Sequence, residues 1–182
     1  MKRKLALGGI TLLAAFLIVI TTSGVASAHE KRHIGPYTLV VGFLNEPAYA
    51  NQQNSLDLTI CNGNDCNYTV QQGLRVVSNP VMNADQTLKA EVIMGSAAPL
   101  ALPLEPRFAN PGKYTSYFIP SKTGAYTFHL FGTLQGMQIN EKFTSGPNTF
   151  GEVDEVHVYP AATTQNNASS PQAQVESAQQ SA

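Results

Sequence analysis

Short β-prone segments separated by turn signals run through the middle of this chain and leave little room for another kind of fold. In residues 55–61 the apolar Leu56, Leu58 and Ile60 alternate with polar residues, the spacing of a strand with one buried face. Beyond the first 28 residues no window has the period of an amphipathic helix. The segments predicted as strands are 37–43, 55–61, 68–71, 87–94, 114–119, 125–133, 137–144 and 153–159.

Turn formers stand between these segments, among them Asn110-Pro111-Gly112 and Ser145-Gly146-Pro147. A chain of many short strands with no helices to cover a sheet must pack sheet against sheet. We therefore predict an all-β protein, an antiparallel β-sandwich of about seven to eight strands.

Residues 123–128, Thr-Gly-Ala-Tyr-Thr-Phe, resemble the corner between two late strands of immunoglobulin-like domains. In that corner a tyrosine, here Tyr126, hydrogen-bonds back to the preceding backbone, and Phe128 would point into the core. The chain lacks the interior Trp and the inter-sheet disulfide of antibody domains. The resemblance therefore implies an immunoglobulin-like architecture without kinship to antibodies.

The beginning of the chain has the layout of a secretory signal peptide. A cationic start at Lys2-Arg3-Lys4 precedes an uncharged stretch over residues 5–20, and Ala26-Ser27-Ala28 is a small-residue cleavage site. A retained membrane anchor is the alternative, but the apolar stretch is shorter than the roughly 20 residues that span a bilayer. We predict a signal peptide over 1–28, one folded domain over 29–160 and a disordered, low-complexity tail over 161–182.

Cleavage after Ala28 has two consequences. The mature protein would be secreted or otherwise extracytoplasmic, in the cell envelope or periplasm, with no membrane anchor and with His29 as its first residue. In an oxidising compartment Cys61 and Cys66 could pair as a disulfide across a turn-rich loop. A metal site or a redox pair are the alternatives, but four intervening residues do not match the redox spacing, and two cysteines alone do not make a zinc site.

Composition and motifs exclude several classes of function. Only 13% of residues are charged and the net charge is −1, so there is no basic patch for nucleic acid or for an anionic membrane. Nucleophile elbows, phosphate loops, zinc-protease helices and dinucleotide fingerprints are absent from the sequence. We predict that the protein is not an enzyme.

A metal site is predicted at His29. A terminal amine and the imidazole of the same residue can chelate one ion, and planar nitrogen donors suit Cu(II). His33 could add a third nitrogen if the chain start folds back. The alternative is that both histidines are merely exposed polar groups. His129, next to inward-pointing Phe128, is expected to face outward from its strand.

The mature start, His29-Glu30-Lys31 after Ala28, resembles that of periplasmic copper-resistance proteins of the CopC-like type, whose mature chains begin with a copper-ligating histidine. Residues 111–128 are similar to exported immunoglobulin-like proteins grouped with copper modules and YtkA-like domains. The CopC-like family also implies an Asp-x-His pair late in the domain.

The nearest match to that pair is Asp154-Glu155-Val156-His157, which has one residue more. On a strand this spacing points Asp154 and His157 to opposite faces. If strand 153–159 returned antiparallel to the same edge of the sandwich, His29, His33 and His157 would converge.

Three functions follow as hypotheses. The first is a copper(II)-binding or copper-handling protein without turnover, with His29 as principal ligand. The second is an immunoglobulin-like module that binds another envelope protein. The third is a redox enzyme with an N-terminal histidine brace, for which the sequence shows no flat aromatic substrate face.

Overall fold

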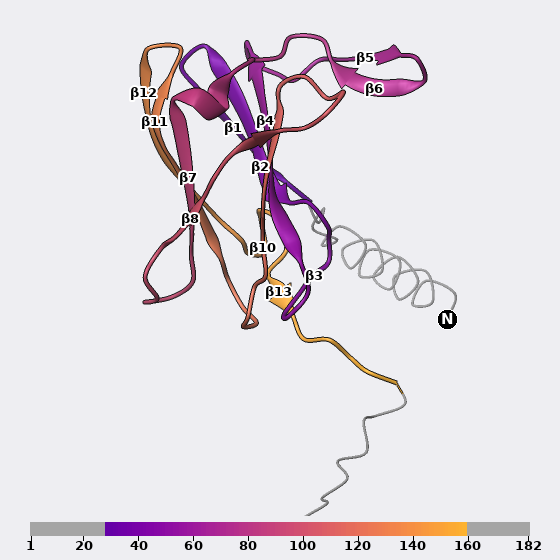
Figure 1. The fold of residues 1–182 in the computed structure, drawn as a ribbon, viewed down its shortest axis with the longest axis vertical. Coiled ribbons are helices and arrows are strands. Elements are labelled where there is room, and N and C mark those ends of the chain that lie inside the picture. The colour runs from indigo at the N-terminus through magenta and orange to yellow at the C-terminus, as the bar shows by residue number, and fades with distance from the viewer. Residues whose placement is uncertain (1–27, 160–182) are drawn as a thin grey trace, which may run out of the picture.

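Two antiparallel sheets packed face to face form the body of the protein (Figure 1). The computed structural model describes residues 28–159, so the predicted signal peptide up to residue 27 and the predicted tail lie outside the described residues. The five-stranded sheet has the order β1 (Glu30–Ile34), β2 (Tyr37–Phe43), β4 (Asn54–Asn62), β10 (Lys113–Phe118) and β9 (Glu105–Pro106).

The second sheet has four strands, in the order β12 (Met137–Thr144), β11 (Thr127–Leu134), β7 (Leu88–Ile93) and β8 (Leu100–Leu102). Two smaller ladders pair β3 (Ala48–Tyr49) with β13 (Val153–Asp154) and β5 (Tyr68–Gln71) with β6 (Leu74–Val77). Within residues 28–159 the only helix is the 3₁₀ turn Ala84–Gln86. The prediction of an all-β sandwich is confirmed.

The core lies between the two sheets and follows from the period of two. Leu56, Leu58 and Ile60 of β4 are fully buried, opposite Phe128 and Leu130 of β11, which are equally buried. At the end of the sandwich nearer the chain start, aromatic rings pack edge to face. These rings belong to Phe43, Phe118, Tyr126, Phe128 and Phe150.

Tyr126 forms the predicted corner. Its hydroxyl donates to the carbonyl of Lys122 at 2.9 Å and accepts from the amide of the same residue at 3.2 Å. The ring is buried, so these bonds satisfy a hydroxyl that would otherwise be costly to bury. Phe128 points inward, as predicted. The more specific immunoglobulin-like assignment stays a prediction.

Most of the strands predicted from the sequence are present, but the last one differs from its prediction. β2, β5 and β12 have the predicted bounds. The predicted strand 153–159 is wrong: strand pairing ends at Asp154, and the short β13 runs parallel to β3 instead of returning antiparallel. The strands β1, β3, β6, β8 and β9 were not predicted. β3, β8 and β9 contain only two or three residues, too few to show an alternation.

β4 also differs from its prediction as a half-buried strand. Every residue from Asn54 to Cys61 is buried, which includes the polar Asp57 and Thr59 on the outer face of the sheet. The outer face is covered because other parts of the chain fold over it at both of its ends.

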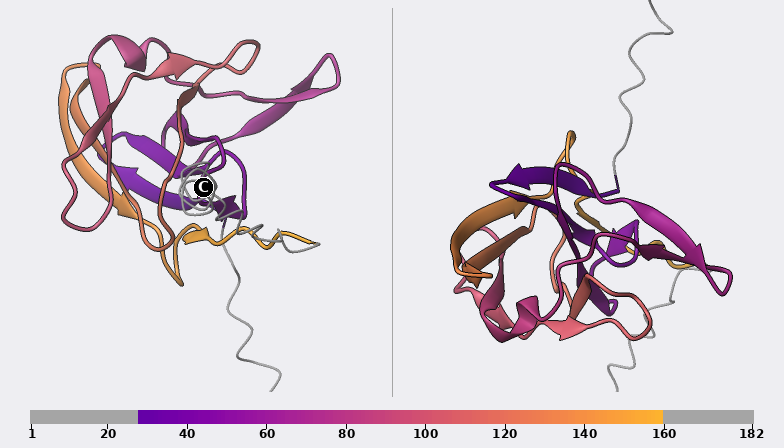
Figure 2. Two further views of the ribbon diagram at one scale, coloured as in Figure 1. Left: turned by 60° about the horizontal axis from the view of Figure 1, so that its bottom comes forward. Right: turned by 90° about the horizontal axis from the view of Figure 1, so that it is seen from above.

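At one end the cover is the β5–β6 hairpin, which projects from the body of the sandwich (Figure 2). The predicted disulfide is present between Cys61 and Cys66, with the Cα atoms 5.3 Å apart. These cysteines and Val77 form a second apolar cluster, with Val40 and Tyr68 packed against it. A disulfide is compatible with an extracytoplasmic protein. None of the helical structure in residues 28–159 could span a bilayer.

Candidate functional site

The other end of the outer face holds the start of the described chain. Because β1 and β2 are antiparallel and Glu30 pairs with Val41, the preceding residue, His29, lies against Gly42. Gly42 in turn is paired with Asp57 on β4. His29, Gly42 and Asp57 therefore follow one another across three neighbouring strands.

Gly42 makes this arrangement sterically possible. A Cβ at position 42 would stand 2.6 Å from the carbonyl oxygen of Ala28 and 2.8 Å from Cδ2 of the His29 ring. Both distances are shorter than Cβ contacts in proteins allow, so any side chain here would push the chain start off the sheet. The imidazole crosses β2 only because β2 has no side chain at this point.

The imidazole of His29 contacts the carboxylate of Asp57. The distance from His29 Nε2 to Asp57 Oδ2 is 3.1 Å, and Arg107, from the loop after β9, approaches Oδ1 at 3.3 Å. Burial of Asp57 raises its pKa, but the hydrogen bond from His29 and the charges of His29, Lys113 and Arg107 outweigh burial and hold the pKa below its ordinary value. Asp57 is therefore a carboxylate over the whole neutral range.

The contact decides how the imidazole can react. A carboxylate at Nε2 favours the neutral tautomer that carries its proton on Nε2, so that the lone pair is on Nδ1. Nδ1 is the nitrogen that closes a six-membered chelate ring with the α-nitrogen of the same residue. Carboxylate groups that orient a histidine in this way are a common outer support of metal sites.

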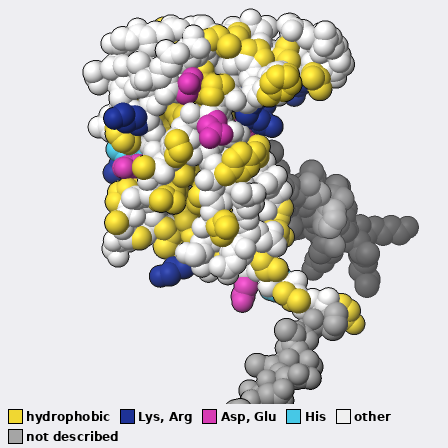
Figure 3. Space-filling view, viewed as in Figure 1, with side chains coloured by type: hydrophobic (Ala, Val, Ile, Leu, Met, Phe, Trp, Pro, Cys, Tyr) yellow, Lys and Arg dark blue, Asp and Glu magenta, His cyan; other side chains and the backbone are white. Residues whose placement is uncertain are grey.

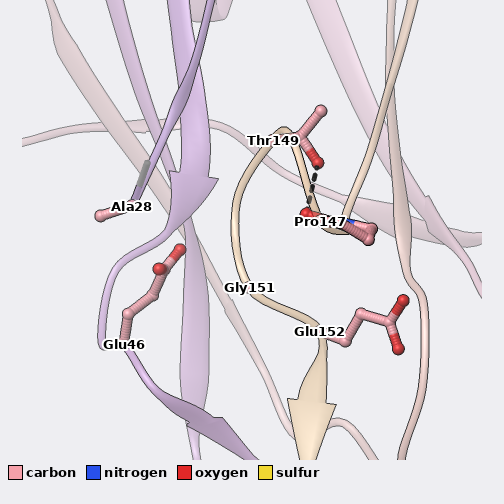
Figure 4. Close-up of a pocket in the computed structure, with 7 residues that line it drawn as sticks. Ala28, Glu46, Pro147, Thr149, Gly151 and Glu152 are labelled. Atoms are coloured by element: carbon pink, nitrogen blue, oxygen red, sulfur yellow. Dashed lines mark hydrogen bonds between the residues drawn. The ribbon is translucent and has the colours of Figure 1, made fainter. Parts of the chain in front are cut away.

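An open cleft of about 560 Å³ lies beside the three residues His29, Gly42 and Asp57, and Ala28 is part of its wall. The opposite wall is the loop after β12, which contributes Pro147, Thr149 and Glu152 (Figure 4). The carboxyl group of Glu46 points from the segment after β2 toward Ala28 (Figure 4). Burial raises the pKa of Glu46, and the charge of His29 opposes that rise without cancelling it.

The structure does not bring the other predicted ligands to this place as one cluster. His33 is exposed and lies four residues along β1, about 13 Å from His29 at the rise of a strand. Asp154 and His157 are both exposed, and the strand that was expected to carry His157 ends before it. Among residues 28–159 no three His, Cys, Asp or Glu side chains are grouped closely enough to hold a metal ion.

His129 faces outward from β11, as predicted, but it is largely covered. Its ring stacks on Phe131, Nδ1 lies 2.8 Å from Glu91 Oε1, and Nε2 lies 2.7 Å from Asn140 Oδ1. The side chain is 16% exposed. These contacts across three strands give His129 a structural role in the second sheet.

Sequence analysis missed Gly42, Glu46 and Asp57. Gly42 interrupts a β-rich run, a signal for close approach of another backbone that could have been used. Asp57 alternates with apolar residues and therefore looks like an ordinary solvent-facing strand residue. Glu46 lies in a turn, where no local pattern marks it.

Comparison of the chain with protein-family models, with curated proteins and with solved structures found no match. The assignment of the site therefore depends on its geometry.

Proposed function

We propose that this is an extracytoplasmic copper(II)-binding protein that holds the ion through a processed amino terminus at His29 and performs no turnover. The observation that supports it is the 3.1 Å contact between His29 Nε2 and Asp57, which favours the Nδ1 lone pair needed for a chelate with the terminal amine. Two nitrogen donors from one residue, with room for oxygen donors beside them, suit the tetragonal coordination of Cu(II).

The role requires that the chain start where a signal peptidase would leave it. In the unprocessed chain the α-nitrogen of His29 is an amide bonded to Ala28, which does not act as an amine donor. Removal of residues 1–28 would place the new amine beside Gly42 and the cleft, because Ala28 is at the edge of that cleft. Mass spectrometry of the exported protein tests this starting point directly.

Calorimetric titration with Cu(II) tests the function. The chain that begins at His29 should bind one copper ion, and a chain that keeps residues 25–28 should bind far more weakly, because its His29 has no terminal amine. The variant His29→Gln should also lose binding. The matched control is His33→Gln, which should bind as the native chain does, because His33 lies about 13 Å further along the strand. Equal binding by the extended and processed chains would refute the proposal.

A protein-interaction module is the second candidate, and a different surface favours it. A groove of about 540 Å³ lies between the loops that follow β7 and β10, with Met94, Leu100 and Ile119 in its wall. Leu100 and Ile119 are 54% and 60% exposed, which is unusual for large apolar side chains around one groove. An apolar segment of another envelope protein would fit such a surface.

Selection of displayed peptides on the native protein would test this second candidate. Peptides that bind the groove should lose binding to Ile119→Glu and keep binding to Val70→Glu, a more exposed apolar site on the projecting hairpin. Peptides that fail to distinguish the two variants would argue against the groove as a docking site.

A further inference from the structure

One oxygen of the Glu46 carboxyl group, Oε1, is buried without a hydrogen-bond partner among the described residues, while backbone N–H groups of Gly151 and Phe43 stabilise the carboxylate as a whole. Buried carboxylate oxygens normally accept hydrogen bonds, because an unpaired one has lost its hydration without replacement. Oε1 can therefore accept one further hydrogen-bond donor or a cation.

The fold brings Glu46 to the chain start for a topological reason. Antiparallel β1 begins where β2 ends, and Glu46 follows the end of β2 by three residues. Ala28 and Glu46 line the same cleft, and the Glu46 carboxyl group points toward the chain start (Figure 4). The charge of His29 acts on Glu46, so the two side chains are close enough to interact electrostatically.

The other acidic groups nearby are less suited to the role of a ligand. Asp57 already has one oxygen at His29 Nε2 and the other at Arg107. Glu152 lines the same cleft but is exposed, so its carboxylate is satisfied by water. Glu46 alone combines a place in the cleft wall with an oxygen that has no partner among the described residues.

We propose that Glu46 supplies the carboxylate oxygen that, with the terminal amine and imidazole Nδ1 of processed His29, forms a three-donor site for a divalent copper ion. This inference rests on the proposed function. A divalent ion would compensate the buried oxygen, and an N,N,O donor set matches the preference of Cu(II) for mixed nitrogen and oxygen ligands in a plane. The cleft leaves room for water as a further ligand.

The test compares three processed chains that begin at His29: native, Glu46→Gln and Glu152→Gln. Both variants remove one negative charge from the same cleft, so general electrostatics change equally and only the ligand differs. Each chain is first checked for a native unfolding midpoint. Glu46→Asp, which keeps the charge but shortens the side chain by one methylene, is the second variant in case Glu46→Gln does not fold.

Copper affinity and the electron paramagnetic resonance spectrum are then measured at one pH. We expect Glu46→Gln to bind Cu(II) at least about tenfold more weakly, the lower limit for disturbed metal-site partners. Its spectrum should shift because an anionic oxygen donor is lost. Glu152→Gln should differ from native by less than about twofold and keep the native spectrum. Glu46→Asp should fall between native and Glu46→Gln.

The outcomes separate this inference from the proposed function. If the native processed chain binds copper and the chain that keeps residues 25–28 does not, while Glu46→Gln matches native in affinity and spectrum, then the role of Glu46 is refuted and the function stands. If the native processed chain binds no copper, both are refuted.

Discussion

The outer face of β4 is covered at both ends, but by opposite means. At the Cys61 end a disulfide and apolar side chains bury it, and hydrophobic side chains are visible on the surface of the projecting hairpin that covers it (Figure 3). Val70 and Leu74 of this hairpin are exposed. At the Asp57 end the cover is polar: an imidazole and a guanidinium meet one carboxylate. The first end is held by a covalent bond within one loop, and the second by ionisable groups from distant parts of the chain.

The difference teaches which end can respond to a ligand. The apolar cluster is closed by a disulfide, and its members include no carboxylate or imidazole that could bind an ion. The polar end is held by hydrogen bonds whose net contribution is about 1 kcal/mol each, so a metal ion could compete with them. The two ends should therefore respond differently to mutation, and the following predictions test that contrast.

The largest loss of stability should come from removal of the disulfide. In the double variant Cys61→Ala, Cys66→Ala, the free energy of unfolding should fall by about 2 kcal/mol, because the short loop is no longer closed in the unfolded chain. Urea unfolding measures the loss. Copper binding by the processed chain should be unchanged, and Val70→Ala in the hairpin that follows the disulfide loop serves as an exposed control. A loss of copper binding would show that the two ends are coupled.

Gly42→Ala should have the next largest effect, at the polar end. The added methyl group would stand 2.6 Å from the Ala28 carbonyl oxygen in the unprocessed chain and 2.8 Å from the His29 ring. We expect a loss of about 1–2 kcal/mol in stability, since overpacking strains the backbone, and a loss of copper binding. Gly146→Ala is the control, because a Cβ there meets nothing within 4 Å. Native-like copper affinity in Gly42→Ala would contradict the proposed position of His29.

Asp57→Asn should cost about 1 kcal/mol, because the buried hydrogen bond to His29 loses its charge. The lowered pKa of Asp57 means that its carboxylate stabilises the fold above the ordinary value of 3.8, and that this stability is lost as pH falls through the lower folded pKa. The variant should therefore lose less stability than the native protein on acidification below that value. Unfolding at a series of pH values measures this, and parallel native and variant curves would argue against the pairing.

Glu46→Gln should have a smaller effect of opposite sign in the chain without metal. The raised pKa of Glu46 means that folding disfavours its charged form, so this group adds stability as pH falls through the folded pKa toward the ordinary value of 4.5. At neutral pH the variant should be slightly more stable than native, as seen by thermal unfolding. A less stable variant would mean that the charge of His29 and the backbone N–H groups of Gly151 and Phe43 outweigh the burial of the carboxylate.

The smallest effect should come from an exposed ion pair between β1 and the disulfide loop. Lys31 Nζ lies 3.3 Å from Asp65 Oδ1, next to the disulfide loop, and both side chains are more than half exposed. Exposed pairs of this kind are screened by water, so Lys31→Ala should leave the unfolding midpoint unchanged within error. A measurable loss would indicate that the ends of the outer face are coupled through this contact.

The strands with the clearest alternation were those the sequence located best. β2, β5 and β12 have the predicted bounds, and Phe128 and Tyr126 occupy the predicted positions, because these features depend on local pattern. The segment 153–159 has the composition of a strand, but only two of its residues pair: both lie beside β3, and Val153 also forms an antiparallel bridge with Gly124. Strand composition does not reveal whether a neighbouring edge is available.

Of the residues in the candidate site, only His29 was predicted from the sequence. His29 stands out because of its position after a cleavage motif, whereas Asp57 looked like a solvent-facing strand residue and is in fact buried. His33 shares the outer face with His29, but an extended strand holds the two about 13 Å apart. Proximity in sequence therefore did not mean proximity in space.

The sequence by itself determined the all-β class, the Cys61–Cys66 pairing and the corner at Tyr126, because each depends on residues within a few positions of one another. Only the tertiary structure decided that Gly42, Glu46 and Asp57 surround His29. These residues come from different strands and turns, and they meet because an antiparallel sheet places the start of one strand beside the end of the next.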